Sequence, residues 1–351
     1  MDRLDEKTTR SRGPSALLIA LLALSLLVSL ALVPARQVLF TGDNYRPMLQ
    51  ALDASGDLTQ VGVLLLNGAG APVQNMAGTS QLNNTQLDQV QGALIPAGWV
   101  QAQALGLLNG LFAYVNWASG QFTPTVSFDA VRENLLANGE TVANRLLDHS
   151  PACSAQDALR FAEGLLTSGN AQPPLCNPPA VIRPILTAWL VSQLAQFANS
   201  LPVQMSLTSL AGPNGQASFA GAFTQGLNTA RLLSGLLDLV ALLAIALLVA
   251  AFIGKGRSFR RALLWVGISL AVGGGLAALL SVLAGHLDVA QLLASLAQGS
   301  STNTSLQTLV GHAGPYLESL WAQAWRLSSL WSLGALGLGG FTALMVALIG
   351  G

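Results

Sequence analysis

The chain alternates long apolar runs with more polar stretches, and four of the runs are long enough to cross a bilayer. They cover residues 15–33, 233–254, 262–285 and 328–350. A membrane-spanning helix needs about 20 predominantly apolar residues. A buried helix of a soluble protein could explain any one run, but four in one chain favour transmembrane helices. The expected fold class is therefore mainly α, with four transmembrane helices.

The first run has a second interpretation. It follows a charged stretch and ends at Val33-Pro34-Ala35, which fits the small-residue cleavage pattern of a signal peptide. Its apolar run of 19 residues exceeds the usual h-region of a signal peptide, which favours an uncleaved anchor. Either interpretation exports the sequence that follows.

The stretch 34–232 predicts a mostly helical extracytoplasmic domain with a small antiparallel strand pair. Apolar residues recur at helical spacing, Ser154 and Asp157 form a capping box, and a helix is expected from Asp129 to about Leu147. Residues 121–128 and 202–210 have the composition of strands, and two strands need to pair and pack on helices. From Ser218 the chain is expected to run as helix into the second span.

Lys and Arg near the spans predict the orientation, because cytoplasmic loops carry an excess of basic residues. This places the tail 1–14, the loop 255–261 and the C-terminus in the cytoplasm. The domain 34–232 and the loop 286–327 then lie outside. The residues that set this topology are Arg3, Lys7, Arg10, Arg12, Lys255, Arg257, Arg260 and Arg261.

The amino-acid composition agrees with a membrane protein and argues against one class of partner, nucleic acid. Only 9% of the 351 residues are charged, 52% are hydrophobic, and 16 basic residues balance 16 acidic ones. The absence of a basic excess argues against nucleic-acid binding, and the high apolarity excludes a disordered chain. Sorted by predicted side, the cytoplasmic segments hold eight basic and three acidic residues, a net +5, and the rest of the chain carries −5.

The only two cysteines, Cys153 and Cys176, both lie in the exported stretch. Because that compartment tends to be oxidising, we expect a disulfide. The alternative is a pair of free buried thiols. A metal site is not expected, since no histidine lies beside either cysteine.

Small residues recur at four-residue spacing in the spans, which is typical of closely packed transmembrane helices. They predict one tight bundle or a homo-oligomer, although an Ala- and Gly-rich chain also produces such spacing by chance. Asp238, in the outer part of the second span, is expected near the headgroups with Arg231 as its partner. The packing residues are Gly267, Ala271, Gly275, Ala335, Gly339 and Ala343, with a further stripe at Ala246, Ala250 and Gly254.

No motif predicts catalysis, a metal or a cofactor. His149, His286 and His312 are the only histidines, they show no HExxH spacing, and there is no P-loop or GxSxG. The near-absence of charged residues inside the spans counts against an ion-coupled transporter. A pore lined by hydroxyls or backbone in an oligomer is an alternative. The expected partners are the lipid bilayer, a second copy or another membrane protein.

Several short motifs together resemble a family of bacterial multi-pass membrane proteins with a helical extracytoplasmic domain. They are Asn44-Tyr45-Arg46, the helix start Pro96 to Gln101, the helix start Asp129 to Glu133, and Cys153-Ser154 with a Pro-flanked Cys176. The resemblance implies a bacterial plasma membrane and the same domain plan. It implies no particular activity.

The function expected from the sequence is therefore non-enzymatic. An integral membrane protein with an exported helical domain would serve envelope organisation, or bind a lipid or a protein. The alternatives are a component of an oligomeric transporter or channel, and, less favoured, an extracytoplasmic enzyme.

Overall fold

The computed structural model describes residues 13–69, 92–154, 156–157, 175–207, 212–253, 259–288, 291 and 304–348. The chain is mainly helical and divides into two compact units. The apolar-helix unit contains Met1–Asn44, Val115–Ala118 and Asn228–Gly351. The disulfide unit contains Tyr45–Tyr114 and Ser119–Leu227.

Four helices are long and apolar enough to cross a membrane, which confirms that part of the expected fold class. They are α1 (Gly13–Leu39), α10 (Gly212–Ile253), α11 (Phe259–Gly285) and α13 (Thr304–Leu348). As expected, α10 begins well before its apolar run and continues through it without a break. Residues 1–12 and 254–258, which hold six of the eight basic residues expected to set the topology, lie outside the described part of the chain.

Two of these helices are longer than the sequence predicts. Helix α1 continues through Pro34 to Leu39, and α13 begins at Thr304 and runs through Pro315. Leucine spacing in the expected loop 286–327 predicts short helices, but residues 304–327 are continuous with the fourth span in one helix. Proline lacks the N–H of a regular helical hydrogen bond and usually ends or kinks a helix. Here, however, both helices continue past their proline, so neither proline marks a helix end.

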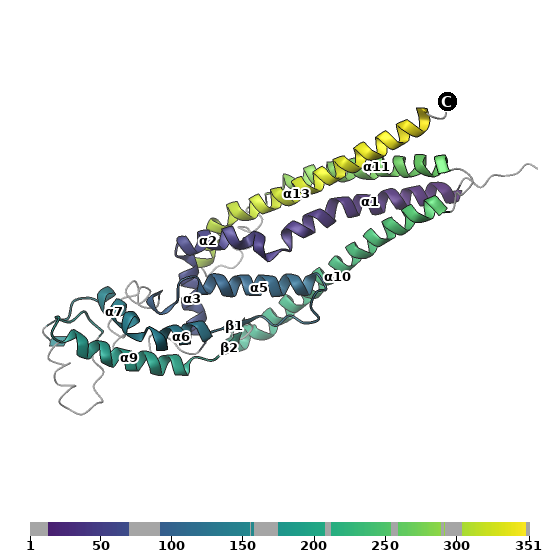
Figure 1. Ribbon diagram of the computed structural model, residues 1–351. Helices are drawn as coiled ribbons and strands as arrows, with labels where there is room; N and C mark the ends of the chain where they lie inside the picture. The colour runs from purple at the N-terminus through teal and green to yellow at the C-terminus, as the bar shows by residue number, and fades with distance from the viewer. Residues whose placement is uncertain are drawn as a thin grey trace, which may run out of the picture. The chain divides into compact units, whose positions relative to one another are not determined.

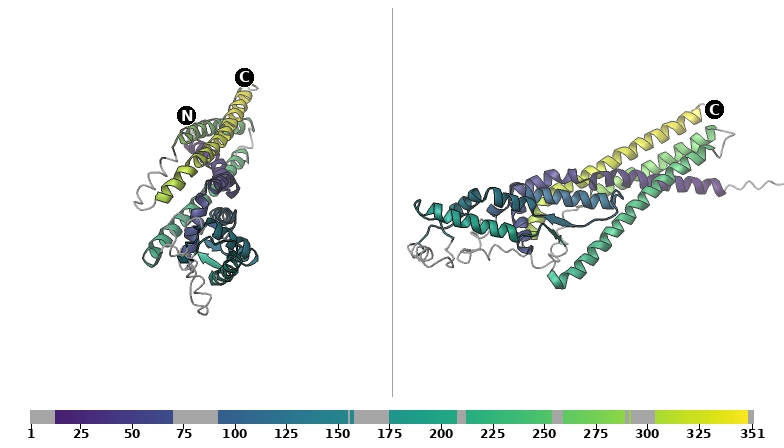
Figure 2. Two further views of the ribbon diagram at one scale, coloured as in Figure 1. Left: turned by 90° about the vertical axis from the view of Figure 1, so that its left-hand side faces the viewer. Right: turned by 60° about the horizontal axis from the view of Figure 1, so that its bottom comes forward.

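Helices α1, α11 and α13 run side by side in the apolar-helix unit (Figures 1 and 2). One end of α1 packs on α13 through a cluster of Ala35, Val38 and Ala324, with Leu39 and Leu327 beside it. The other end packs on α10, where Leu22 and Leu26 meet Ala244. The apolar clusters that α1 forms with α10 and with α13 therefore lie on different stretches of α1.

The disulfide unit is built from short helices around a small sheet. Its elements are η1 (Gly42–Tyr45, shared with the other unit), α2 (Arg46–Ala54), α3 (Asp57–Gly68), α5 (Trp99–Val115), α6 (Asp129–Ala137), α7 (Gly139–His149) and α9 (Arg183–Ser200). Buried leucines and valines of α6, α7 and α9 form its core; they include Val131, Leu135, Leu146, Leu147, Leu186, Leu190 and Leu194.

The two expected strands are present, shorter than predicted, and they pair antiparallel. β1 (Thr125–Ser127) pairs with β2 (Gln204–Ser206), and Val126 lies opposite Met205. Both of these side chains are buried. Two side chains of α5 pair with the backbone of Ser127. The Ser127 carbonyl accepts from the Trp99 indole at 3.1 Å, and the Ser127 N–H donates to the Gln103 amide oxygen at 3.1 Å. The sheet therefore packs on a helix, as the sequence requires.

The helix expected from Asp129 to Leu147 is two helices. Asn138 separates α6 from α7, and Gly139 begins α7. A Cβ added at Gly139 would lie 3.4 Å from the Val191 side chain. The break falls at two residues with weak helix propensity, which apolar periodicity alone does not register.

Candidate functional site

The polar centre of the apolar-helix unit is Arg36, near the end of α1. Its guanidinium donates from Nε to the Asn116 amide oxygen at 3.0 Å and from Nη1 to the Ser234 carbonyl at 3.1 Å. Nη1 also forms an ion pair with the Asp238 carboxylate at 2.8 Å. The Arg36 side chain is 15% exposed and the Asp238 side chain 53%. One cation thus joins α1, α10 and the segment Val115–Ala118.

This arrangement corrects the expected partner of Asp238. The sequence predicts Arg231, which lies on the same helix, but the structure pairs Asp238 with Arg36. The Arg231 guanidinium instead lies over the Trp117 ring, 4.1 Å from its centroid. Residues seven apart on a helix lie two turns apart, so a cation on a neighbouring helix reaches the carboxylate better.

Asn116 and Trp117 fasten the short segment Val115–Ala118 to α1 and α10. The Asn116 amide donates to the Phe40 carbonyl at 3.2 Å as well as accepting from Arg36. The Trp117 indole donates to the Arg231 carbonyl at 3.0 Å, and a Cβ added at Gly235 would lie 3.1 Å from its nitrogen. Gly235 therefore provides the flat surface on which the ring lies. Sequence reasoning missed this contact, because Trp117 and Arg231 lie 114 residues apart in the chain.

The predicted packing residues of α11 and α13 lie against one another. A Cβ added at Gly339 would lie 2.5 Å from the Ala271 nitrogen and 2.6 Å from the Gly267 oxygen, and one at Gly267 would lie 3.0 Å from the Ala343 nitrogen. Distances this short to backbone atoms leave no room for a side chain. The two backbones approach closely at these glycines, as small residues permit.

The residues at the contact between α11 and α13 differ at one position from the predicted packing residues. Gly274, rather than the predicted Gly275, approaches the backbone of α13, since its added Cβ would lie 2.7 Å from both the Leu336 nitrogen and the Ser332 oxygen. Gly275 meets only the end of the Leu336 side chain. Ala335 contributes its Cβ to the same approach, 3.2 Å from the added Cβ of Gly274. The four-residue spacing in the sequence could not show this shift of one position.

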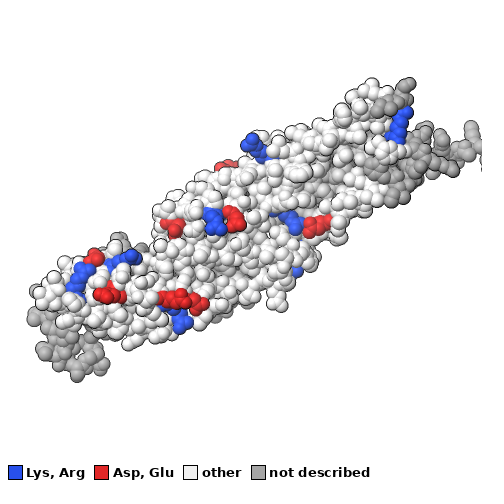
Figure 3. Space-filling model, viewed as in Figure 1, with Lys and Arg blue, Asp and Glu red and all other residues white. Residues whose placement is uncertain are grey.

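Arg260 lies where α11 begins and α13 ends. Its Nε and Nη2 donate to the Val346 carbonyl at 3.2 and 3.1 Å. A cation at the C-terminal turn of a helix compensates the partial negative charge of the free carbonyls. The start of α11 is thus fixed to the end of α13. On the face that Figure 3 presents, charged side chains are few, and several Lys or Arg side chains lie next to an Asp or Glu.

In the disulfide unit, the two cysteines lie at disulfide distance, with 4.9 Å between their Cα atoms. Around them, the Cys153 N–H donates to the Asn177 carbonyl at 3.1 Å and the Asn177 N–H donates to the Pro151 carbonyl at 2.7 Å. The expected capping box is confirmed too, because the Ser154 hydroxyl accepts from the Asp157 N–H and the Asp157 carboxylate accepts from the Ser154 N–H. A helix is expected from this capping box to about Leu166, and its part beyond Asp157 lies outside the described residues.

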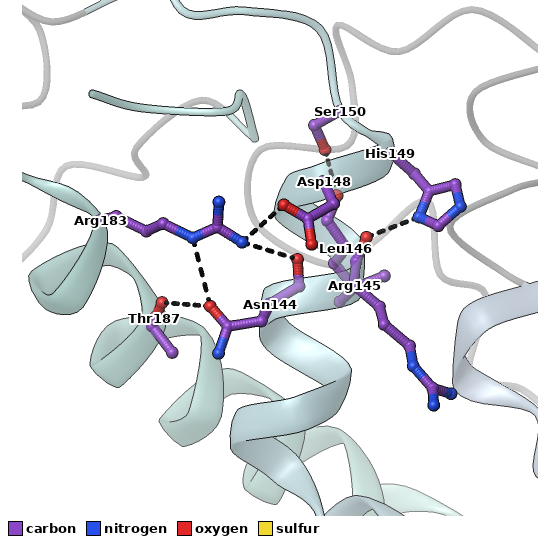
Figure 4. Close-up of polar contacts among 8 residues, drawn as sticks. All are labelled: Asn144, Arg145, Leu146, Asp148, His149, Ser150, Arg183 and Thr187. Atoms are coloured by element: carbon purple, nitrogen blue, oxygen red, sulfur yellow. Dashed lines mark hydrogen bonds and ion pairs between the residues drawn. The ribbon is translucent and has the colours of Figure 1, made fainter. Parts of the chain in front are cut away.

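A second polar cluster joins α7 to α9 (Figure 4). Arg183 donates to the Asp148 carboxylate at 2.6 Å and to the Asn144 side chain at 3.4 Å, and the Thr187 hydroxyl donates to the same amide oxygen at 3.3 Å. Figure 4 shows His149 pointing away from Arg183. The cluster therefore joins the two helices through polar contacts at a partly exposed edge.

The three histidines are divided between the two units. His149 bonds through Nδ1 to the Arg145 carbonyl at 2.7 Å, within its own helix, and His286 and His312 belong to the other unit. Within the described ranges, no group of three His, Cys, Asp or Glu side chains has the arrangement of a metal site.

Among the described residues outside the apolar helices, one titratable group has a shifted pKa. Burial raises the pKa of the Tyr45 phenol above its ordinary value. The ring packs against Phe112, with 5.5 Å between centroids. Removing water from around the phenol disfavours the charged phenolate, so the neutral form persists to higher pH.

Comparison with protein-family models, with curated proteins and with solved structures found no match for this chain.

Proposed function

We propose that the protein is a non-enzymatic integral membrane protein whose disulfide unit lies outside the cytoplasm and binds a lipid or a protein of the cell envelope. The chain would cross the plasma membrane of a bacterium four times, with both termini in the cytoplasm. The disulfide unit would then be the part available to a partner.

One observation carries the proposal. All four helices that are long and apolar enough to cross a membrane belong wholly or in their apolar part to one unit, while the cysteine pair and the sheet belong to the other. A disulfide favours an oxidising compartment, and apolar helices favour a bilayer. The division of the chain therefore supports an anchored unit and an exported one.

Cysteine labelling in intact cells tests the orientation. A Ser258→Cys variant should resist a membrane-impermeant maleimide until the cells are opened, because residue 258 lies in the loop with Lys255, Arg257, Arg260 and Arg261. A Ser301→Cys variant should be labelled from outside. The opposite pattern would reverse the proposed topology.

Binding by the disulfide unit is tested with the purified full chain. Native mass spectrometry should retain envelope phospholipid on the wild-type protein, and removal of the cysteine pair by substitution should lower the retained amount. If the lipid stays bound equally in both, the site is not in the disulfide unit. A protein partner would instead appear as a specific cross-link to residues of that unit in cells.

Buried hydroxyls favour a second candidate, a component of an oligomeric transporter or channel. Ser269 and Ser281 on α11 and Ser332 on α13 are buried and have no hydrogen-bond partner in the structure. Polar groups inside apolar helices are costly and often line a path. Liposomes containing the purified protein separate the two candidates, because a stable oligomer with conductance favours the second and contradicts the first.

A further inference from the structure

Val115–Ala118 has an unusual place in the chain. The residues on either side, up to Tyr114 and from Ser119, belong to the disulfide unit, whereas these four belong to the apolar-helix unit. Asn116 bonds to Arg36 and to the Phe40 carbonyl, and Trp117 bonds to the Arg231 carbonyl. The segment therefore contacts both α1 and α10.

The backbone of this segment is strained where it contacts α10. Trp117 has φ of 62°, and it is the only residue other than glycine with positive φ in the described part of the chain. A bulky residue rarely adopts this left-handed conformation, which persists only where surrounding contacts hold it. Here the contacts are the Arg231 carbonyl, the Arg231 guanidinium and the face of Gly235. Loss of these contacts lets the backbone relax.

Helix α10 depends on these polar contacts over part of its length. Its apolar cluster with α1 lies around Ala244. The leucines nearer the segment are largely exposed, with Leu232 at 62% and Leu236 at 55%. Around Ser234 and Asp238, the contact between α10 and α1 runs through Arg36. This half of α10 is thus held by groups that also hold Val115–Ala118.

We propose that Val115–Ala118 is a strap with two positions, docked and released, and that it holds α10 against α1. In the docked position Trp117 lies on Gly235 and Asn116 accepts from Arg36. In the released position Trp117 leaves the left-handed region and Asn116 no longer accepts from Arg36, so that the direct bonds of Arg36 to Ser234 and Asp238 alone hold this half of α10 to α1. Because the chain on both sides of the strap belongs to the disulfide unit, movement of Tyr114 or Ser119 changes the strap directly and α10 through it.

Substitution at Gly235 tests the strap without changing the strap itself. Gly235→Val presses a branched side chain against the Trp117 ring, since its Cβ alone would be 3.1 Å from the indole nitrogen. The matched control is Gly334→Val, also within a long apolar helix, where an added Cβ would meet nothing within 4 Å. Hydrogen exchange of the purified full chain should become at least tenfold faster in residues 113–120 and around 232–239 for Gly235→Val, and stay unchanged there for Gly334→Val.

A second variant, Trp117→Ala, removes the ring and keeps Gly235. It should accelerate exchange in the same two stretches while leaving α11 and α13 as in the wild type. If residues 113–120 exchange faster but 232–239 do not, the segment does not hold α10 and the proposal fails. Unchanged exchange in both stretches for both variants would also overturn it. If Gly235→Val unfolds the chain, the Trp117→Ala result alone decides.

Discussion

Single glycines set how closely α11 and α13 approach. Gly339→Ala introduces a methyl group at 2.5 Å from the Ala271 nitrogen, so the helices must separate and the free energy of unfolding should fall by about 1–3 kcal/mol. Gly337→Ala is the matched control, because an added Cβ there meets nothing within 4 Å and alanine favours a helix. Thermal unfolding of both variants in detergent measures the difference. Equal midpoints for the two would show that the close approach does not contribute to stability.

Tyr45 gives a pH dependence whose sign follows from its raised pKa. In the unfolded chain this phenol ionises at about pH 10, whereas in the folded chain it stays neutral to a higher pH. Its contribution to stability is therefore fully present below the unfolded pKa and is lost as pH rises through the folded pKa. Tyr45→Phe should remove this part of the alkaline destabilisation and delete from an ultraviolet titration a phenolate that appears above the ordinary tyrosine pKa. A titration in which the phenolate lost by Tyr45→Phe appears at or below that value would contradict the burial argument.

At the scale of elements, the cysteine pair fixes the chain around Pro151–Cys153 to the chain around Cys176–Asn177. The closed loop holds about 22 residues, so cross-linking should stabilise the disulfide unit by about 3 kcal/mol on the chain-entropy estimate. Double substitution to alanine, Cys153→Ala with Cys176→Ala, should lower the denaturant midpoint of that unit. Addition of a thiol reductant to the wild type should reproduce the shift and have no effect on the double variant. A reductant effect on the double variant would show that the shift has another cause.

The sequence predicts those elements whose signal is local. Apolar runs predict four helices, alternation with Thr, Val and Phe predicts β1, and the Ser154–Asp157 spacing predicts a capping box; all are present. The boundaries of α1 and α13 are missed, because packing carries both helices through a proline that is unfavourable locally. The contacts of Arg36, Asn116 and Trp117 are missed for a different reason. They join three stretches that are far apart in the chain, and no periodicity in a single sequence predicts a contact between such stretches.

At the scale of the whole molecule, the two units have separate cores, since the Leu22 and Ala35 clusters belong to one and the buried leucines of α7 and α9 to the other. Stability changes at distant, unconnected sites should therefore remain local. Gly339→Ala should accelerate hydrogen exchange in α11 and α13 and leave α7 and α9 unchanged. Loss of the cysteine pair should do the reverse.

The two changes combined in one chain give the decisive measurement. If the units open independently, the exchange rates of α7 and α9 in the combined variant equal those of the cysteine variant alone, and those of α11 and α13 equal those of Gly339→Ala alone. A strap at Val115–Ala118 adds one exception, because it belongs to one unit and is continuous with the other. Residues 113–120 are thus the stretch where the two effects should combine non-additively, and additive rates there would mean that the units do not communicate through it.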